Sequence, residues 1–175
     1  MLGANVQLLP SLPNATVSRA MQLDAAGNIY VTGSVIPAGK IVASAFVAKL
    51  SPDGSQVIYF TAMGGSFGEM APSLALGSDG SAYVAGTTNS YDFPVTAGAL
   101  ASTFQGQAPQ GFLAKVNPAG SVVYSTFIAG PASTQITGIA LDAPVTSFSQ
   151  ASAVRRTLRQ MACHFRGLLW KSMRR

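Results

Sequence analysis

The stretch from Gly64 to Gly68 reads Gly-Gly-Ser-Phe-Gly and contains the Gly-x-Ser-x-Gly pattern that carries the nucleophilic serine of many hydrolases. That chemistry needs a strand before Ser66, a helix after it, and a histidine that accepts the proton of the serine. The preceding run VIYFTAM fits a strand, but the single histidine is His164, near the C-terminus. The pattern therefore favours a sharp glycine-rich connection between strands, and we predict no catalytic residue.

Other residues that could bind a metal are too sparse to do so. Asp24, Asp53 and Asp79 each stand within three residues of a glycine, as in calcium loops. Calcium takes about six to eight oxygen ligands, and each of these stretches offers one carboxylate. Cys163 and His164 are adjacent and supply two of the roughly four ligands that a structural zinc site needs. The sequence predicts turns at these aspartates, with no metal and no cofactor.

The charges are few and unevenly distributed. Charged residues make up 10% of the chain and hydrophobic residues 48%, which excludes a disordered chain and a coiled coil. Residues 1–142 carry four basic and six acidic side chains, whereas residues 143–175 carry seven basic and no acidic ones. Nucleic-acid surfaces need basic side chains interleaved with aromatic ones. The body of the chain lacks them, so we predict no nucleic-acid partner.

Two parts of the chain repeat one another. MQLDAAGNIYVTG at 21–33 matches LALGSDGSAYVAG at 74–86, an offset of 53 residues that aligns Tyr30 with Tyr83. AFVAKLSPDG at 45–54 matches GFLAKVNPAG at 111–120 at an offset of 66 residues. The change of offset indicates an insertion of 13 residues within the stretch 87–110. Repeated units of this length are typical of architectures built from stacked copies of one small element.

Each copy predicts four short strands. Runs rich in Tyr, Val, Ile, Phe and Thr alternate with turns that contain Asp, Pro and Gly, beginning with a strand around 19–24. The consecutive apolar residues Val57 to Phe60 indicate sheets covered on both faces. We therefore predict an all-β partial β-propeller: a lead-in at 1–18, four-stranded antiparallel blades at about 19–66 and 71–130, and the first strand of a third blade at 136–142.

Several motifs resemble a known family. AGNIYVTG, SYDFPVTAGAL, AFVAKLSPDG, VIYFTAMGGS, GFLAKVNPAG and VVYSTFIAG are similar to the SBBP repeat, a bacterial seven-bladed β-propeller repeat, over residues 19–142. The resemblance implies four-stranded blades around a central axis, often in large exported or cell-surface proteins, without a shared catalytic residue set. Closed propellers contain about four to eight blades. The expected partners are thus the remaining blades of a larger propeller or other copies of the chain.

The long stretch 87–110 is the candidate contact surface, because loops at the ends of strands commonly carry binding. Its candidate residues are Tyr91, Asp92, Phe93 and Pro94. A protein or a carbohydrate is the expected kind of ligand, and the residues also match the repeat pattern, so a packing role stays open.

Residues 143–175 diverge from the repeat and predict a basic amphipathic helix. Such a helix can lie on an anionic membrane surface, enter a groove of a partner, or fold back over an exposed blade. An apolar, arginine-rich terminus can also arise by chance after an abrupt break in the repeat. The candidate contact residues are Arg155, Arg156, Arg159, Phe165, Arg166, Trp170 and Lys171.

These features predict a noncatalytic scaffold or binding module of a larger exported or cell-surface protein. The alternatives are a peripheral membrane protein attached through its tail, or a fragment of a propeller-type hydrolase or lyase. The last would need several His, Asp or Glu side chains that converge on one site. The N-terminus lacks the basic and long apolar regions of a signal peptide, so the sequence assigns no compartment.

Overall fold

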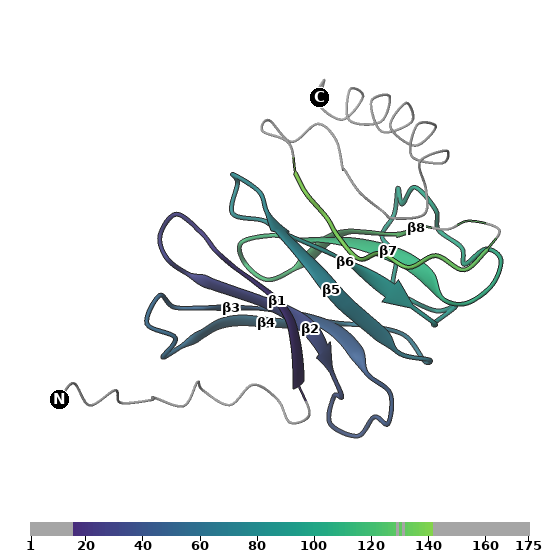
Figure 1. Cartoon of the computed structure of the whole chain (residues 1–175), viewed down its shortest axis with the longest axis horizontal. Coiled ribbons are helices and arrows are strands. Elements are labelled where there is room, and N and C mark those ends of the chain that lie inside the picture. The colour runs from purple at the N-terminus through teal and green to yellow at the C-terminus, as the bar shows by residue number, and fades with distance from the viewer. Residues whose placement is uncertain (1–15, 129, 131, 142–175) are drawn as a thin grey trace.

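The computed structural model describes residues 16–128, 130 and 132–141, and this part of the chain is all-β. Two four-stranded antiparallel sheets follow one another along the chain (Figure 1). The first sheet contains β1 (Thr16–Leu23), β2 (Ile29–Val35), β3 (Ser44–Leu50) and β4 (Val57–Met63). The second sheet contains β5 (Glu69–Leu76), β6 (Ala82–Thr88), β7 (Gln110–Val116) and β8 (Val122–Ile128). The predicted all-β class with two four-stranded antiparallel sheets is confirmed, and among the described residues no helix is long and apolar enough to span a membrane.

Tight turns end the strand pairs at matching places in the two sheets. The backbone N–H of Gly54 donates to the carbonyl of Ser51 at 2.9 Å, and that of Gly120 donates to the carbonyl of Asn117 at 2.9 Å. A left-handed backbone costs other residues about 1–2 kcal/mol, which explains the glycines. The four turns have positive φ at Gly27 (82°), Gly54 (71°), Gly80 (75°) and Gly120 (86°).

The strands of the first sheet differ from expectation at both of its edges. β1 begins at Thr16, before the expected start at 19, because Thr16 pairs with Val35 at the end of β2. The apolar run in β4 is not covered on both faces, since Val57 is 36% and Ile58 is 51% exposed. β4 is an edge strand of a sheet whose neighbour covers one face. The rest of the predicted lead-in lies outside the described residues.

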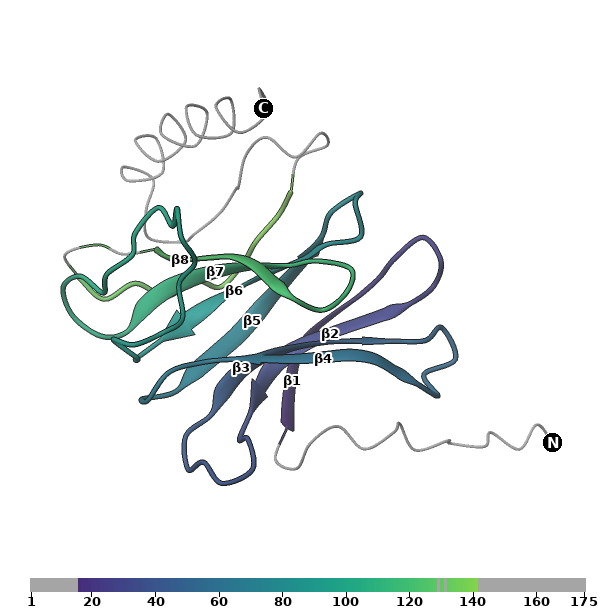
Figure 2. The same ribbon diagram turned by 180° about the vertical axis from the view of Figure 1, so that it is seen from behind.

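The two sheets pack face against face, and β5 runs along β1 and β2 of the first sheet (Figures 1 and 2). The core between them includes Tyr30 and Val47 from the first sheet and Leu74 and Val84 from the second, each at most 4% exposed. Side chains alternate along a strand, so Tyr83, next to Val84, points away from the first sheet. Tyr30 and Tyr83 occupy matching registers, opposite Lys49 and Lys115 respectively. The sheets therefore stack with unlike faces in contact.

Residues 132–141 lie against the outer face of the second sheet. Ile136 is 3% exposed and packs with Ala85 and Leu113. The backbone N–H of Ile139 donates to the hydroxyl of Ser73 at 2.8 Å. The third-blade strand expected at 136–142 is not formed over 136–140, and Leu141 makes a single bridge. A first strand needs a second one to pair with, and none among the described residues pairs with this segment as a sheet. The predicted helical tail, 143–175, lies outside the described residues.

Candidate functional site

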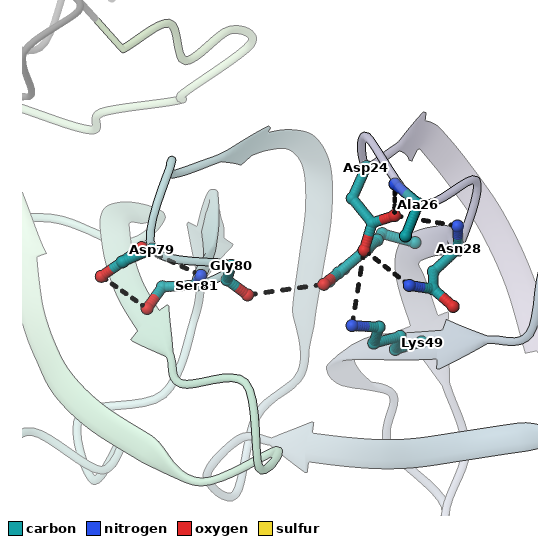
Figure 3. A network of polar contacts seen from close by, with 8 residues as sticks. Asp24, Ala26, Asn28, Lys49, Asp79, Gly80 and Ser81 are labelled. Atoms are coloured by element: carbon teal, nitrogen blue, oxygen red, sulfur yellow. Dashed lines mark hydrogen bonds and ion pairs between the residues drawn. The ribbon is translucent and has the colours of Figure 1, made fainter.

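A turn at the end of the first sheet holds Asp24 by several donors (Figure 3). Its carboxylate accepts hydrogen bonds from the backbone N–H groups of Ala26 and Asn28, both at 2.9 Å, and from the Asn28 side chain at 2.8 Å. The Lys49 ammonium lies 3.4 Å away. The hydrogen bond from the Asn28 side chain is the main cause that lowers the pKa of Asp24 to about 2, and Lys49 adds to it. These contacts use the carboxylate to close a turn, as the sequence predicted for this aspartate.

The second sheet has a similar arrangement at Asp79, which stands two positions later in the repeat than Asp24. Its carboxylate accepts from the Lys115 ammonium at 2.9 Å. It also accepts from the backbone N–H of Ser81 at 3.0 Å (Figure 3). Lys115 also lies over the Tyr83 ring, 5.3 Å from its centroid. Lys49 lies over the Tyr30 ring in the same way, 4.9 Å from its centroid, so an aspartate, a lysine and a tyrosine recur together at the same end of each sheet. This recurrence, with every partner internal, assigns the unit to strand-end packing.

The turn aspartates predict a loss of stability in acid. The pKa of Asp53 is also lowered to about 2, first by the hydroxyl of Ser51 and then by Ser55, against an ordinary value of 3.8. Between these values the unfolded chain binds more protons than the folded one, so the free energy of unfolding falls as the pH drops from 3.8 toward 2. The double variant Asp24→Asn, Asp53→Asn should reduce this slope in urea denaturation measured across that range. An unchanged slope would contradict the assignment.

The glycine-rich connection between the sheets is a clasp. The Ser66 hydroxyl donates to Asp92 at 2.6 Å, and the Ser66 backbone N–H donates to the same carboxylate at 2.9 Å. The residues after Ser66 enter β5 at Glu69, so the helix that a nucleophile elbow requires is replaced by a strand. The hydroxyl that would act as the nucleophile and the backbone N–H of Ser66 both bind the loop that carries Asp92.

Glu69 is a buried carboxylate that the sequence did not single out. It is 4% exposed and accepts hydrogen bonds from the hydroxyls of Thr88 and Ser90 and from the backbone N–H of Gly65 at 3.2 Å. All of these donors are neutral, and they satisfy both carboxylate oxygens. The lone glutamate of the chain could have signalled a special position, but its partners come from a loop whose path the sequence does not show.

The four candidate contact residues have different surroundings. Tyr91 is 61% exposed, and its ring lies 6.2 Å from that of Phe67, which is 63% exposed. Asp92 holds Ser66, and the Pro94 carbonyl accepts from the Ser125 hydroxyl at 2.6 Å. Phe93 is 3% exposed and belongs to the core between the sheets. Tyr91, Asp92 and Pro94 are thus exposed, with Asp92 and Pro94 also hydrogen-bonded within the chain, whereas Phe93 is buried.

Residues 89–109, here called the edge loop, run along the outer edge of β8. The Thr96 N–H donates to the Ser125 carbonyl at 3.2 Å, and the Phe127 N–H donates to the Ala101 carbonyl at 3.1 Å. These bonds satisfy backbone groups that an edge strand otherwise exposes for pairing with another chain. The offsets of the repeat located the inserted residues but did not reveal this role. Its signal was the absence of charge from residue 93 to residue 110.

Two matched tyrosines differ in the partner of the hydroxyl. Tyr124 in β8 accepts a hydrogen bond from the Leu100 N–H of the edge loop at 3.2 Å. Tyr59, its counterpart in β4, is 9% exposed, and its hydroxyl has no hydrogen-bond partner among the described residues. Burial raises the pKa of the Tyr59 hydroxyl, since the charged form loses its solvation. The edge loop of the second sheet supplies a donor that the first sheet lacks.

This difference predicts opposite effects of one substitution. Tyr59→Phe removes a buried hydroxyl without a partner and should raise the free energy of unfolding by about 1 kcal/mol. Tyr124→Phe removes the acceptor of Leu100 and should lower it by about 0.5–1.5 kcal/mol. Urea unfolding of both variants measures the two effects, and each variant is the control of the other. Shifts of the same sign in both would contradict the assignment.

The last candidates are the groups that could bind a metal and the residues of the C-terminal tail. Among residues 16–128, 130 and 132–141, no three His, Cys, Asp or Glu side chains are grouped so that they could hold a metal ion. Cys163, His164 and the seven tail residues named as membrane or partner contacts lie outside the described residues. No family model matches the chain, and the search of curated proteins found no match.

Proposed function

We propose that the chain is a noncatalytic β-propeller module of the SBBP type, consisting of two blades and a segment, residues 132–141, that takes the place of the first strand of a third. In this proposal it is a scaffold or binding part of a larger exported or cell-surface protein. The observation that carries the proposal is the position of residues 132–141. They lie on the second sheet as β5 lies on the first.

The same contacts recur at both junctions. The Glu69 N–H at the start of β5 donates to the Ala43 carbonyl at 2.9 Å, and the Thr134 N–H donates to the Pro109 carbonyl at 2.8 Å. Both carbonyls belong to the residue just before a third strand, β3 or β7. At both junctions, therefore, the segment that follows a sheet begins with a backbone hydrogen bond to the residue before the third strand of that sheet. A chain that adds units in this way is typical of propellers and other repeat architectures.

Unlike faces meet in such stacking, and this has a geometric consequence. A contact between unlike faces leaves a free face at each end of the stack, so it continues until a ring closes or a filament grows. Closure into a propeller requires about four to eight blades. The two complete sheets are too few for this, so the proposed module functions together with further blades.

The proposed contact surface of the module is the exposed aromatic pair Tyr91 and Phe67. Their rings meet edge to face beside Asp92, and Phe104 packs on Tyr91 with 4.4 Å between ring centroids. Aromatic rings supply a large apolar area with little loss of side-chain freedom, which suits a protein or carbohydrate ligand. This surface lies where the clasp at Ser66 meets the edge loop, so the fold holds it in a fixed shape.

A tandem protein tests the propeller proposal. Further copies of residues 66–130, inserted after residue 130 of the full chain, would extend it to about six to eight units. We expect ring-shaped particles in electron microscopy and cooperative unfolding at a higher temperature than that of the parent chain. The control carries lysine at the positions of Leu74 and Leu76 in each added copy, which blocks stacking. Extended, flexible particles of the tandem protein that lacks the lysine substitutions would refute the proposal.

A further inference from the structure

The outer face of the first sheet is apolar across all four strands. Met21 pairs with Val31 across β1 and β2, and Leu23 pairs with Ile29. The same rows continue through β3 and β4, and the face carries no charged side chain in these rows. Met21 (65%), Leu23 (61%) and Val57 (36%) are exposed on the two edge strands, whereas Ala48 and Leu50 in β3 are at most 1% exposed. We call this surface the docking face; its rows contain Met21, Val31, Ala48, Phe60, Leu23, Ile29, Leu50 and Val57.

The second sheet shows what such a surface does when a partner is present. Leu74 and Leu76 stand in β5 where Met21 and Leu23 stand in β1, as their pairing with Val84 and Ala82 demonstrates. Leu74 is 4% exposed, because the first sheet packs over it, and Leu76 is partly buried on the same core. One structural position is therefore buried in the second sheet and open in the first.

We propose that the docking face binds the outer face of the second sheet in another copy of this chain. The inference rests on the proposed function, which it extends by naming the partner of one open end. The contact would repeat, between two molecules, the contact that joins the two sheets within one. A docking of two like faces is disfavoured, since the internal interface joins unlike ones.

The outer face of the second sheet carries the residues that this contact needs. Tyr83, Lys115 and Tyr124 stand there in the register of Tyr30, Lys49 and Tyr59, which form the corresponding face of the first sheet. An arriving copy would thus meet the same three types of side chain that the second sheet meets within the chain.

The polar contacts of the internal interface also have counterparts. Tyr30 donates to the Gly80 carbonyl at 3.4 Å, and the Thr61 hydroxyl donates to the Gly120 carbonyl at 2.5 Å. The acceptors lie in turns of the second sheet. The matching turns of the first sheet contain Gly27 and Gly54 with the same positive φ. The docking face therefore has apolar rows and turn carbonyls in the arrangement that the internal interface uses.

Residues 132–141 compete with the second copy. They lie on the second sheet where β5 lies on the first, and β1 of the arriving copy would take the same position. Docking must therefore displace Ile136 from its contact with Ala85 and Leu113. The expected association is concentration-dependent and weaker than the internal interface.

Sedimentation velocity of the full chain over a range of concentrations tests the proposal. Met21→Lys, Leu23→Lys should weaken association about tenfold or more, because two large apolar side chains leave the centre of the contact. The control Ile36→Lys, Ile41→Lys adds the same charge at side chains that are 39% and 95% exposed in the loop between β2 and β3. Equal weakening by the control, or a parent chain that stays monomeric at every concentration, would overturn the proposal.

Two further variants test the geometry. Ile136→Ser should strengthen association, because it loosens the competing segment; weaker association would refute displacement. Met21→Cys in a Cys163→Ser background should form no disulfide-linked dimers on oxidation, and rapid formation would show that like faces meet. If the tandem protein closes into rings while the chain does not associate through Met21, only the docking between copies is wrong. If association through Met21 persists without closed tandem rings, the propeller proposal is wrong.

Discussion

Replacement of Phe93 by alanine should lower the free energy of unfolding by about 3–5 kcal/mol, the usual cost of removing a buried phenylalanine. The Phe93 ring lies 4.7 Å from that of Phe112 and 5.9 Å from that of Phe127, both in the core of the second sheet. The ring also holds the start of the edge loop, whose backbone groups form hydrogen bonds with the outer edge of β8. We therefore expect the variant to lose the core contact and the cover of the edge together.

The matched control is Tyr91→Ala, two residues earlier in the same loop. Tyr91 is 61% exposed, and exposed substitutions usually change stability by about 0.5 kcal/mol or less. Urea unfolding of both variants, followed by far-ultraviolet circular dichroism, gives the two free energies. A small effect of Phe93→Ala would mean that the loop does not depend on its core contact. A large loss of stability in Tyr91→Ala would show that Tyr91 serves packing, which contradicts its assignment to the proposed contact surface.

The same comparison separates the two roles that the sequence left open for residues 91–94. Phe93 packs in the core, whereas Tyr91 keeps most of its side chain exposed. The letters alone could not separate them, since aromatic residues serve both purposes and strand period does not apply in a loop. The direction of each ring depends on the path of the edge loop along β8, which is a contact between residues about 30 positions apart.

The strands and turns were predictable because their causes are local. Gly54 and Gly120 follow aspartate or alanine in turns that need a positive φ, and the β-branched and aromatic runs between the turns favour strands. Which face of each strand is buried was harder to predict from the sequence. The run Val57 to Phe60 indicates burial on both faces in a stacked sheet, yet β4 lies at an edge, where Ile58 is exposed. The exposure of a strand's side chains depends on which other sheets pack on its own sheet, and no local sequence pattern encodes this.

Substitution of Gly86 by alanine should cost about 3 kcal/mol, at the upper end of the usual cost of overpacking. A Cβ atom on Gly86 would lie 2.0 Å from the Met70 carbonyl oxygen, a backbone atom that cannot rotate away. The approach is this close because β5 has an irregularity between Met70 and Ser73, opposite β6. The recurrence of glycine at 33 and 86 in the repeat therefore has a steric cause.

Gly33→Ala should cost less than Gly86→Ala, although its Cβ would lie 1.9 Å from the Val17 carbonyl oxygen. β1 and β5 are both edge strands that contact each other, but the outward side chains Met21 and Leu23 of β1 are exposed, so β1 can move away. β5 is also held from its other side, where the Ile139 N–H donates to Ser73. Gly98→Ala is the control for backbone strain alone, since Gly98 has a φ of 81° and open space around it, with an expected cost of about 1–2 kcal/mol. Urea unfolding should rank Gly86→Ala as the most destabilising of the three. Equal costs at Gly33 and Gly86 would contradict the view that β5 is fixed by packing on both sides and β1 is free on one.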